Sequence, residues 1–479
     1  MASLQRNTIF YGLQTFAERI LSFFVLPLLT KTLPTEFYGI WTQIIITAGL
    51  FAGLFGFHTG VVRFLAGHKD PREMNGFFHK ILGVVLSIAA LFCLATVIFA
   101  APFSRAMLGN EASAHLLPVF GVFVAMEILF ELVTAHLRAN EHIGPLSVYQ
   151  FIKSAGRVGL LALGILVIKV DLGTVLLWLI FLQLALLAWM YGKHILRDGG
   201  FHFHSPSIPW REFLSFSLPL IPYGLLMWGN NFSDRYVILH VLNMKEVSIY
   251  AVSYSIAGTV SVLYAVLGFT IYPNLARLWN QGRSDEVARK LSKATEYYLF
   301  FSLPLVALLT LLHQPLVRLL AKSEFVSQIW VMFWLSSGIV AFGVYQLNYY
   351  ITLLAKKNLL NILILVVSSL INVGVNLAVV PRVGIVGAAF TTFLSNGVLA
   401  GATIWLARRT VAYRFEWKPV PRMLAGTLAL SAFLLILSRW VSVEGVIRIA
   451  LASGVSLCLY AVVDFASKDS YLLHLRKAL

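Results

Sequence analysis

The chain has 479 residues, of which 59% are hydrophobic and only 12% are charged, and its mean hydropathy is +0.81. Ordinary soluble domains carry about 25% charged residues, so this composition excludes a soluble protein and indicates a polytopic membrane protein. The net charge of +16 comes from Lys and Arg in short loops between apolar segments, where such residues set topology and contact anionic headgroups. A nucleic-acid-binding role is therefore not expected.

Apolar windows of about 20 residues predict an all-α fold with about 14 transmembrane helices. In chain order these are 9–30, 41–66, 81–101, 115–137, 146–168, 173–192, 213–241, 248–276, 294–313, 326–354, 359–380, 384–407, 420–440 and 444–466. Lys and Arg concentrate in the loops on the side of the two termini, which predicts that both termini are cytoplasmic. The loops on the other side, such as "TKTLPTEFYG", are short, so no sizeable extracytoplasmic domain is expected.

The sequence also indicates an internal repeat. Shifting the chain against itself by about 212 residues aligns "EFYGIW" with "SIYAVS" and "LRANEHIG" with "LLAKKNLL". Loose alignment of any two polytopic sequences remains the alternative, but the constant offset favours two pseudo-symmetric six-helix lobes, an architecture of secondary transporters. The predicted domains are an N-terminal lobe, a cytoplasmic linker, a second lobe, and two additional helices with a cytoplasmic tail, at 1–197, 198–212, 213–412 and 413–479.

Small residues and cysteines inside the spans suggest packing roles. Gly49, Gly53, Gly56 and Gly60 form overlapping GxxxG spacings, and Gly397 with Gly401 forms another, so close helix contact is expected at these glycines. Both cysteines, Cys93 and Cys458, lie in apolar runs and are interpreted as packing residues rather than as a disulfide or metal site.

Four charged residues flank the predicted hairpin between the fourth and fifth spans. Glu131 and Lys153 lie at equal distances from the turn near His142, and so do Glu127 and Arg157. Each like-charged pair has the i, i+4 spacing that places both side chains on one helix face. The pattern favours a structural double ion pair, Glu131 with Lys153 and Glu127 with Arg157, over a ligand site.

The segment "GLLMWGNNFSDRYVILHVL" places an acid, a base and two amides inside an apolar span, where a charge at the helix centre costs roughly 2.5 to 3.5 kcal/mol. Adjacent helix residues point about 100° apart, so Asp234 and Arg235 are expected to pair poorly with each other. Together with Asn230 and Asn231 they predict a broad polar wall beside a wet cavity. The alternative is that Asp234 and Arg235 pair with the adjacent charges Arg19 and Glu18 of the first span.

Several segments resemble one family when taken in order. They are "FVLPLLTKTLPTEFYGIW", "FSLPLIPYGLLMWGNNFSDRYVI", "LNMKEVSIYAVSYSIA", "IYPNLARLWNQGRSDEVARKLSKA" and "INVGVNLAVVPRVGIVGAAFTTFLSNGVLAGATIWLARR". Together they resemble the polysaccharide transporters, the Wzx-type O-antigen or exopolysaccharide repeat-unit flippases of the multidrug/oligosaccharidyl-lipid/polysaccharide exporter superfamily. The resemblance implies two six-helix lobes around a central cavity, in agreement with the repeat.

The same resemblance implies a function in a bacterial inner membrane. The substrate would be an undecaprenyl-pyrophosphate-linked oligosaccharide moved from the cytoplasmic to the periplasmic leaflet, with membrane lipids as surroundings and a polymerase and a chain-length regulator as candidate partners. No cofactor is implied, and H⁺ or Na⁺ coupling stays open, with Glu18 and Asp234 as candidates for a coupling or counter-ion role. The family's cavity arginines map onto Arg19, Arg63 and Arg235.

Arg277 falls near Arg63 in the repeat alignment, and both are predicted to lie at the cytoplasmic ends of equivalent helices. A guanidinium fork suits phosphate oxygens, so both are expected to capture the pyrophosphate.

Three alternatives share some of these features. A cation-coupled drug antiporter and a lipid II flippase would have the same fold. An enzyme such as a repeat-unit polymerase or ligase would be expected to carry a large extracytoplasmic loop, and no nucleotide-binding loop or metal-ligand cluster is evident in the sequence. Transport is therefore preferred over catalysis.

Overall fold

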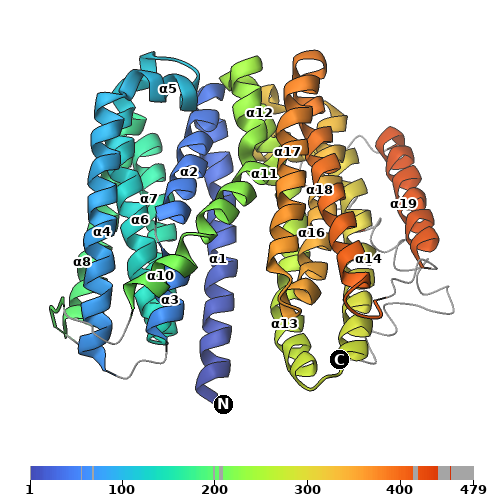
Figure 1. Ribbon diagram of the computed structural model, residues 1–479. Helices are drawn as coiled ribbons and strands as arrows, with labels where there is room; N and C mark the ends of the chain where they lie inside the picture. The colour runs from blue at the N-terminus through green and yellow to red at the C-terminus, as the bar shows by residue number, and fades with distance from the viewer. Residues whose placement is uncertain are drawn as a thin grey trace. The chain divides into compact units, whose positions relative to one another are not determined.

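The computed structural model describes residues 2–55, 57–66, 70–197, 200–203, 209–413, 419–440 and 454 (Figure 1). These residues form helices joined by short connections, and no strand occurs among them. They divide into two compact units, the first ending at Trp228 and the second beginning at Gly229, so the division falls within one helix. The predicted span 444–466 and Cys458 lie outside the described residues.

The first unit is built from helices α1 to α10 and the start of α11. The elements are α1 (Ala2–Thr32), α2 (Thr35–Phe55), α3 (His58–Leu65), α4 (Pro71–Ile98), α5 (Ala100–Leu108), η1 (Ala112–Leu116), α6 (Leu117–Ala139), α7 (Ile143–Ala162), η2 (Leu163–Ile168), α8 (Leu172–Tyr191), η3 (Gly192–Leu196) and α10 (Trp210–Ser217). Helix α6 is its centre and packs against α2, α3, α4 and α8. Helix α1 packs chiefly along α7.

The second unit contains the rest of α11 and all later helices. The elements are α11 (Leu220–Val241), α12 (Met244–Ala257), η4 (Gly258–Val260), α13 (Ser261–Asn280), α14 (Ser284–Leu311), α15 (His313–Leu320), η5 (Ser323–Phe325), α16 (Ile329–Leu354), α17 (Asn358–Val383), α18 (Ile385–Arg408) and α19 (Val420–Trp440). Helices α16 and α18 form the most extensive contact, and α17 packs on α18. Helix α19 packs on α14 through Met423, Leu430 and Leu434.

Ten helical segments of the described chain are long and apolar enough to cross a membrane, and two shorter apolar helices accompany them, at Phe23–Thr32 and Val420–Ile436. Large apolar side chains stay exposed on the outer helices, for example Leu91 at 67%, Phe181 at 65% and Leu359 at 71%. Exposed apolar surface of this extent is matched by lipid rather than by water. The chain is therefore an all-α, multi-pass membrane protein, as the sequence predicts.

Polar caps and one close contact fix the ends and spacing of these helices. The carboxylates of Asp70 and Asp171 begin α4 and α8 by accepting backbone N–H groups of Arg72 at 2.9 Å and Thr174 at 3.2 Å. In the second unit, a Cβ added at Gly338 of α16 would lie 3.1 Å from the Cα atom of Phe393 in α18. Gly338 therefore allows the closest approach of the two central helices.

The glycines of the predicted GxxxG contacts differ from Gly338 in their surroundings. An added Cβ would meet no atom within 4 Å at Gly49, Gly53, Gly397 or Gly401, whereas Gly60 packs against Ser217. The expectation of close contact is therefore wrong for those four glycines, because GxxxG spacing also occurs on helix faces that pack loosely. Gly56 lies outside the described residues.

Candidate functional site

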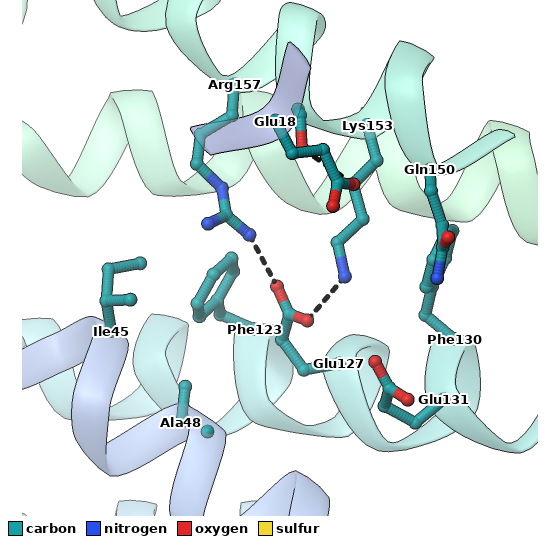
Figure 2. Close-up of a pocket in the computed structure, with 12 residues that line it drawn as sticks. Glu18, Ile45, Ala48, Phe123, Glu127, Phe130, Glu131, Gln150, Lys153 and Arg157 are labelled. Carbon is teal, nitrogen blue, oxygen red and sulfur yellow. Dashed lines mark hydrogen bonds and ion pairs between the residues drawn. The ribbon is translucent and has the colours of Figure 1, made fainter. Parts of the chain in front are cut away.

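A polar pocket of about 340 Å³ opens inside the first unit, among helices α1, α2, α6 and α7 (Figure 2). Ile45, Ala48, Gly49, Phe123 and Phe130 supply apolar walls. The polar lining consists of three carboxylates, two cations, an amide and a hydroxyl, from Glu18, Glu127, Glu131, Lys153, Arg157, Gln150 and Ser154. Charged groups at this density within apolar spans are a marker of function or of an ion-pair network.

Glu127 is the centre of the charged groups. Its carboxylate accepts hydrogen bonds from Lys153 Nζ at 2.5 Å and from Arg157 Nη2 at 3.2 Å, which Figure 2 marks with dashed lines. The Gln183 amide of α8 adds a third hydrogen bond at 2.8 Å. Lys153 Nζ also lies 4.0 Å above the Phe130 ring. One carboxylate thus compensates two cations, with only 12–27% of these side chains exposed.

The predicted pairing of Lys153 with Glu131 is wrong, whereas that of Arg157 with Glu127 is present. The turn centres on Glu141, midway between the end of α6 at Ala139 and the start of α7 at Ile143. Counted from there, Glu127 lies at about 14 residues, between Lys153 at about 12 and Arg157 at about 16, so one acid reaches both bases. The prediction placed the turn one residue too late.

Two carboxylates of the pocket remain outside this network. Glu18 of α1 accepts a hydrogen bond from the Ser154 hydroxyl at 3.1 Å. Glu131 lines the pocket one turn from Glu127, and it has no ion-pair partner within the described part of the chain. With all groups ionised, the pocket carries more negative than positive charge. Such a lining suits hydroxyl groups or a cation better than a phosphate.

A second polar cluster lies within the second unit, where α11 meets α12, α17 and α18. Asp234 accepts hydrogen bonds from the Tyr250 hydroxyl at 2.5 Å and from the Thr392 hydroxyl at 3.3 Å. Arg235 Nη1 lies 3.5 Å from the Asp234 carboxylate, and its guanidinium is 4.4 Å from the centre of the Tyr254 ring. Asn230 donates to Asn396 at 3.0 Å and accepts from Ser368 at 2.8 Å.

This geometry corrects the expected solvated wall. Asn230, Asp234 and Arg235 are only 2–4% exposed and are bonded to side chains of the second unit. Asp234 and Arg235 contact each other although they are neighbours, because the long Arg side chain curls back so that Nη1 also reaches the carbonyl of Asn231 at 3.4 Å. The expectation that Asp234 and Arg235 pair poorly with each other is therefore wrong, and the structure shows a packed polar core.

Sequence reasoning missed the uncharged members of this core. Asn372 accepts from Ser233 at 2.9 Å and donates to Ser395 at 3.0 Å, and Asn376 donates to Asn372 at 3.1 Å. The i, i+4 asparagines in "NVGVN" of an otherwise apolar helix are the signal that could have found them. Charged residues alone do not reveal this asparagine pattern.

The remaining predicted site residues lie elsewhere. Arg63 is exposed on α3, and its guanidinium lies 4.0 Å from the centre of the Phe216 ring of α10. Arg277 is exposed in the last turn of α13. The side chain of Arg19 is not among the described ones. Among the residues that the structure describes, no group of three or more His, Cys, Asp or Glu could hold a metal ion.

Membrane-length helices in two units, with charged groups inside the spans, define a multi-pass membrane protein, and comparison with solved structures identifies its fold. The lipid II flippase MurJ, in an inward closed conformation, superposes with a TM-score of 0.75 at 13% identity, over 95% of this chain and 98% of that chain. Two MATE-family multidrug resistance transporters of the MOP superfamily also match. The inward-facing one has a TM-score of 0.68 at 15% identity and the outward-facing one 0.59 at 14%, covering 85% of this chain and 94% or 93% of theirs.

A family profile described as "Polysaccharide biosynthesis protein" matches residues 4–279, more than half of the chain. The chain therefore belongs to the polysaccharide biosynthesis protein family. Its fold is that of the lipid II flippase MurJ and of the MATE-family transporters. A comparison with curated protein sequences gives no match.

Proposed function

We propose that this transporter moves an undecaprenyl-pyrophosphate-linked oligosaccharide repeat unit from the cytoplasmic to the periplasmic leaflet of a bacterial inner membrane by alternating access. The observation that carries the proposal is the family match to polysaccharide biosynthesis proteins, found in a chain with a transporter fold. A lipid-linked sugar is the form in which polysaccharide precursors meet a membrane transporter. Both termini would be cytoplasmic, and a polymerase and a chain-length regulator would act next.

The pocket of the first unit supports a sugar-bearing substrate. Its carboxylates, the Gln150 amide and the Ser154 hydroxyl offer acceptors and donors of the kind that sugar hydroxyls bond. Lys153 and Arg157 are both bonded to Glu127, and the pocket's three carboxylates outnumber these two cations, so the pyrophosphate would be bound elsewhere. Glu18, which lies outside the ion-pair network, is our candidate for coupling to H⁺ or Na⁺.

Exposed arginines would bind the pyrophosphate. Arg63 and Arg277 are both exposed, and each carries the planar fork that suits phosphate oxygens. We assign Arg19 and Asn231 to the substrate cavity, as the sequence predicts. Arg235 is buried, which favours a role in positioning neighbouring side chains over direct contact with the substrate. The domain division into two six-helix lobes plus two C-terminal helices also belongs to this proposal.

The alternative functions are a lipid II flippase and a cation-coupled drug antiporter. The similarity to MurJ favours the first and the similarity to MATE transporters the second, at the level of fold. Both alternatives predict that repeat-unit export is not the activity of this chain.

Complementation separates these functions. Bacterial strains lacking a defined repeat-unit flippase, a lipid II flippase or a drug exporter would each receive this gene, and surface glycan, viability and drug resistance would be measured. We expect surface glycan to return in a repeat-unit strain, and Arg63→Gln with Arg277→Gln to reduce it without reducing protein in the membrane. Rescue of the lipid II strain or of drug resistance alone would overturn the proposal.

A further inference from the structure

A groove of about 540 Å³ runs between α13 and α14 of the second unit, the helical hairpin drawn in yellow tones in Figure 1. On α13 it is lined by residues at helical spacing, which places them on one face. These are Leu267, Thr270, Ile271 and Asn274. The α14 lining comes from Arg289, Lys290, Lys293, Ala294 and Tyr297.

The groove has a basic end and an apolar end. Near the turn of the hairpin lie Arg289, Lys290 and Lys293, and no carboxylate is among the described residues that line the groove. About 10 Å further along α14, which is seven residues at the helical rise, the walls are Leu267, Ile271 and the half-buried Tyr297. A ligand that fills the groove therefore needs a compact anionic group joined to an apolar chain.

The basic charges are only partly compensated. Lys293 pairs with the buried Glu296 at 2.8 Å. Lys290 donates instead to the neutral amide oxygen of Asn274 at 2.9 Å, which ties the two helices together at the basic end. Arg289 has no ion-pair partner within the described part of the chain. Arg289 and Lys290 thus line the groove without an ion pair in the described part of the chain.

The position of the groove favours a lipid as occupant. Both helices belong to membrane-spanning segments, and Val266 and Phe269 of α13 are 57% and 52% exposed next to the groove. The apolar end is therefore continuous with surface that meets hydrocarbon, while the turn lies at the polar end of the hairpin. The lining offers few groups for a bulky oligosaccharide, because Asn274 and Thr270 are its only uncharged aliphatic polar side chains.

We infer that the α13–α14 groove binds an anionic phospholipid of the surrounding membrane, with the headgroup phosphate on Arg289, Lys290 and Lys293 and an acyl chain along Leu267, Ile271 and Tyr297. The occupant is a resident lipid and not the transported substrate. Each basic side chain near an anionic lipid contributes about 1 kcal/mol, or about fivefold in affinity. Because Lys293 is already paired with Glu296, the other two together contribute about a 25-fold preference for an anionic headgroup.

The test uses the full chain, purified, delipidated in detergent and mixed with phosphatidylglycerol or phosphatidylcholine of identical acyl chains. Native mass spectrometry measures the lipid retained. We expect the wild type to retain phosphatidylglycerol selectively. The triple variant Arg289→Gln, Lys290→Gln, Lys293→Gln should retain both lipids equally. A charge-matched control, Lys245→Gln, Lys322→Gln, Arg382→Gln, changes exposed residues of the second unit outside the groove and should behave as wild type.

A second variant tests the apolar end. The Thr270 hydroxyl bonds only to carbonyls of its own helix, so Thr270→Trp fills the groove without removing a contact between helices. It should reduce phosphatidylglycerol retention with all basic charges present. Equal retention by the triple variant and wild type would overturn the site. Loss in the triple variant with unchanged retention in Thr270→Trp would overturn the acyl chain's place in the groove, because the basic end alone would then hold the lipid through its headgroup. Neither result depends on transport of an oligosaccharide.

Discussion

At the scale of single residues, the two polar clusters show what sequence could and could not predict. The chain identifies Glu127, Lys153 and Arg157 as an ion-pair group because their distances from a turn can be counted. The same counting cannot fix partners to within one helical residue, so the predicted pairing of Glu131 with Lys153 is wrong. The buried core around Asp234 depends on hydroxyl and amide groups from three other helices, which no local pattern brings together.

The first residue-scale prediction concerns Glu127. Removing one partner of a buried ion pair costs about 3 to 5 kcal/mol, so Glu127→Gln should strongly lower the thermal stability of the purified protein. Glu131→Gln is the matched control, one turn away in the same pocket, and should change stability by less than about 0.5 kcal/mol. The triple variant Glu127→Gln, Lys153→Gln, Arg157→Gln removes all three charges of the network and should recover much of the loss. Equal damage from Glu127→Gln and Glu131→Gln would contradict the network.

The second residue-scale prediction concerns Asp234. Asp234→Asn keeps an oxygen that can accept from Tyr250 but leaves the Arg235 charge buried without its carboxylate, so stability should fall by about 3 kcal/mol. Neutralising both, with Asp234→Asn and Arg235→Gln, should recover part of it. If Asp234 is only a counter-ion, the transport that remains in Asp234→Asn should depend on the proton gradient as strongly as wild-type transport does. Transport rates measured at imposed proton gradients test this. If Asp234→Asn abolishes only the gradient-driven part, Asp234 is instead a coupling carboxylate.

At the scale of helices, spans are readable from apolar length, because backbone groups in lipid must be bonded within the helix. Contacts between helices are harder to predict from the sequence. The GxxxG spacing of Gly397 and Gly401 marks an open face, whereas the isolated Gly338 makes the close approach. The tertiary arrangement decides which small residue lies at a helix crossing. The spacing of small residues in the sequence does not predict it.

The helix-packing prediction follows from this contact. A Cβ at Gly338 would lie 3.1 Å from Phe393 Cα and 3.2 Å from its backbone nitrogen, and backbone atoms cannot rotate away. Gly338→Ala should therefore destabilise the protein by about 1 to 3 kcal/mol. The control Gly397→Ala adds the same atom to open space and should leave the melting temperature unchanged or higher. Equal stability of Gly338→Ala and wild type would show that α16 and α18 pack differently.

A pH-dependent prediction concerns the start of α8. The hydrogen bond from the Thr174 hydroxyl lowers the pKa of Asp171 below its ordinary value, and the backbone N–H of Thr174 adds to the effect. A lowered pKa means that the carboxylate stabilises the fold above the unfolded value of about 3.9, and that this contribution is lost as the pH falls through the folded value. Asp171→Ala should cost about 1 kcal/mol at neutral pH.

Melting curves of wild type, Asp171→Ala and Asp171→Asn from pH 7 to pH 3 test this cap. The difference between wild type and Asp171→Ala should shrink as the pH falls below about 4. Asn keeps an oxygen acceptor without a titrating charge, so the gap between Asp171→Asn and Asp171→Ala should stay constant. A constant gap between wild type and Asp171→Ala over the whole range would rule out the charged cap.

At the scale of the whole molecule, composition and span length predict an all-α membrane protein, and motif order predicts the polysaccharide family that the family match shows. The reason is that lipid solvent restricts spanning structures to a few kinds. Substrate identity is different, because a lipid II flippase and multidrug transporters share this one fold. It depends on the polar groups of particular pockets, whose arrangement the sequence does not contain.

The central claim is that the chain flips a lipid-linked oligosaccharide, and reconstitution tests it most directly. The purified protein would be reconstituted in proteoliposomes with one of three fluorescent substrates: undecaprenyl-pyrophosphate oligosaccharide, lipid II or a cationic drug. An impermeant quencher would follow the transfer of each lipid to the outer leaflet and of the drug to the lumen. The account predicts rapid transfer of the oligosaccharide lipid, with slower transfer in Arg63→Gln and Arg277→Gln. Transfer of lipid II or the drug, with none of the oligosaccharide lipid, would contradict it.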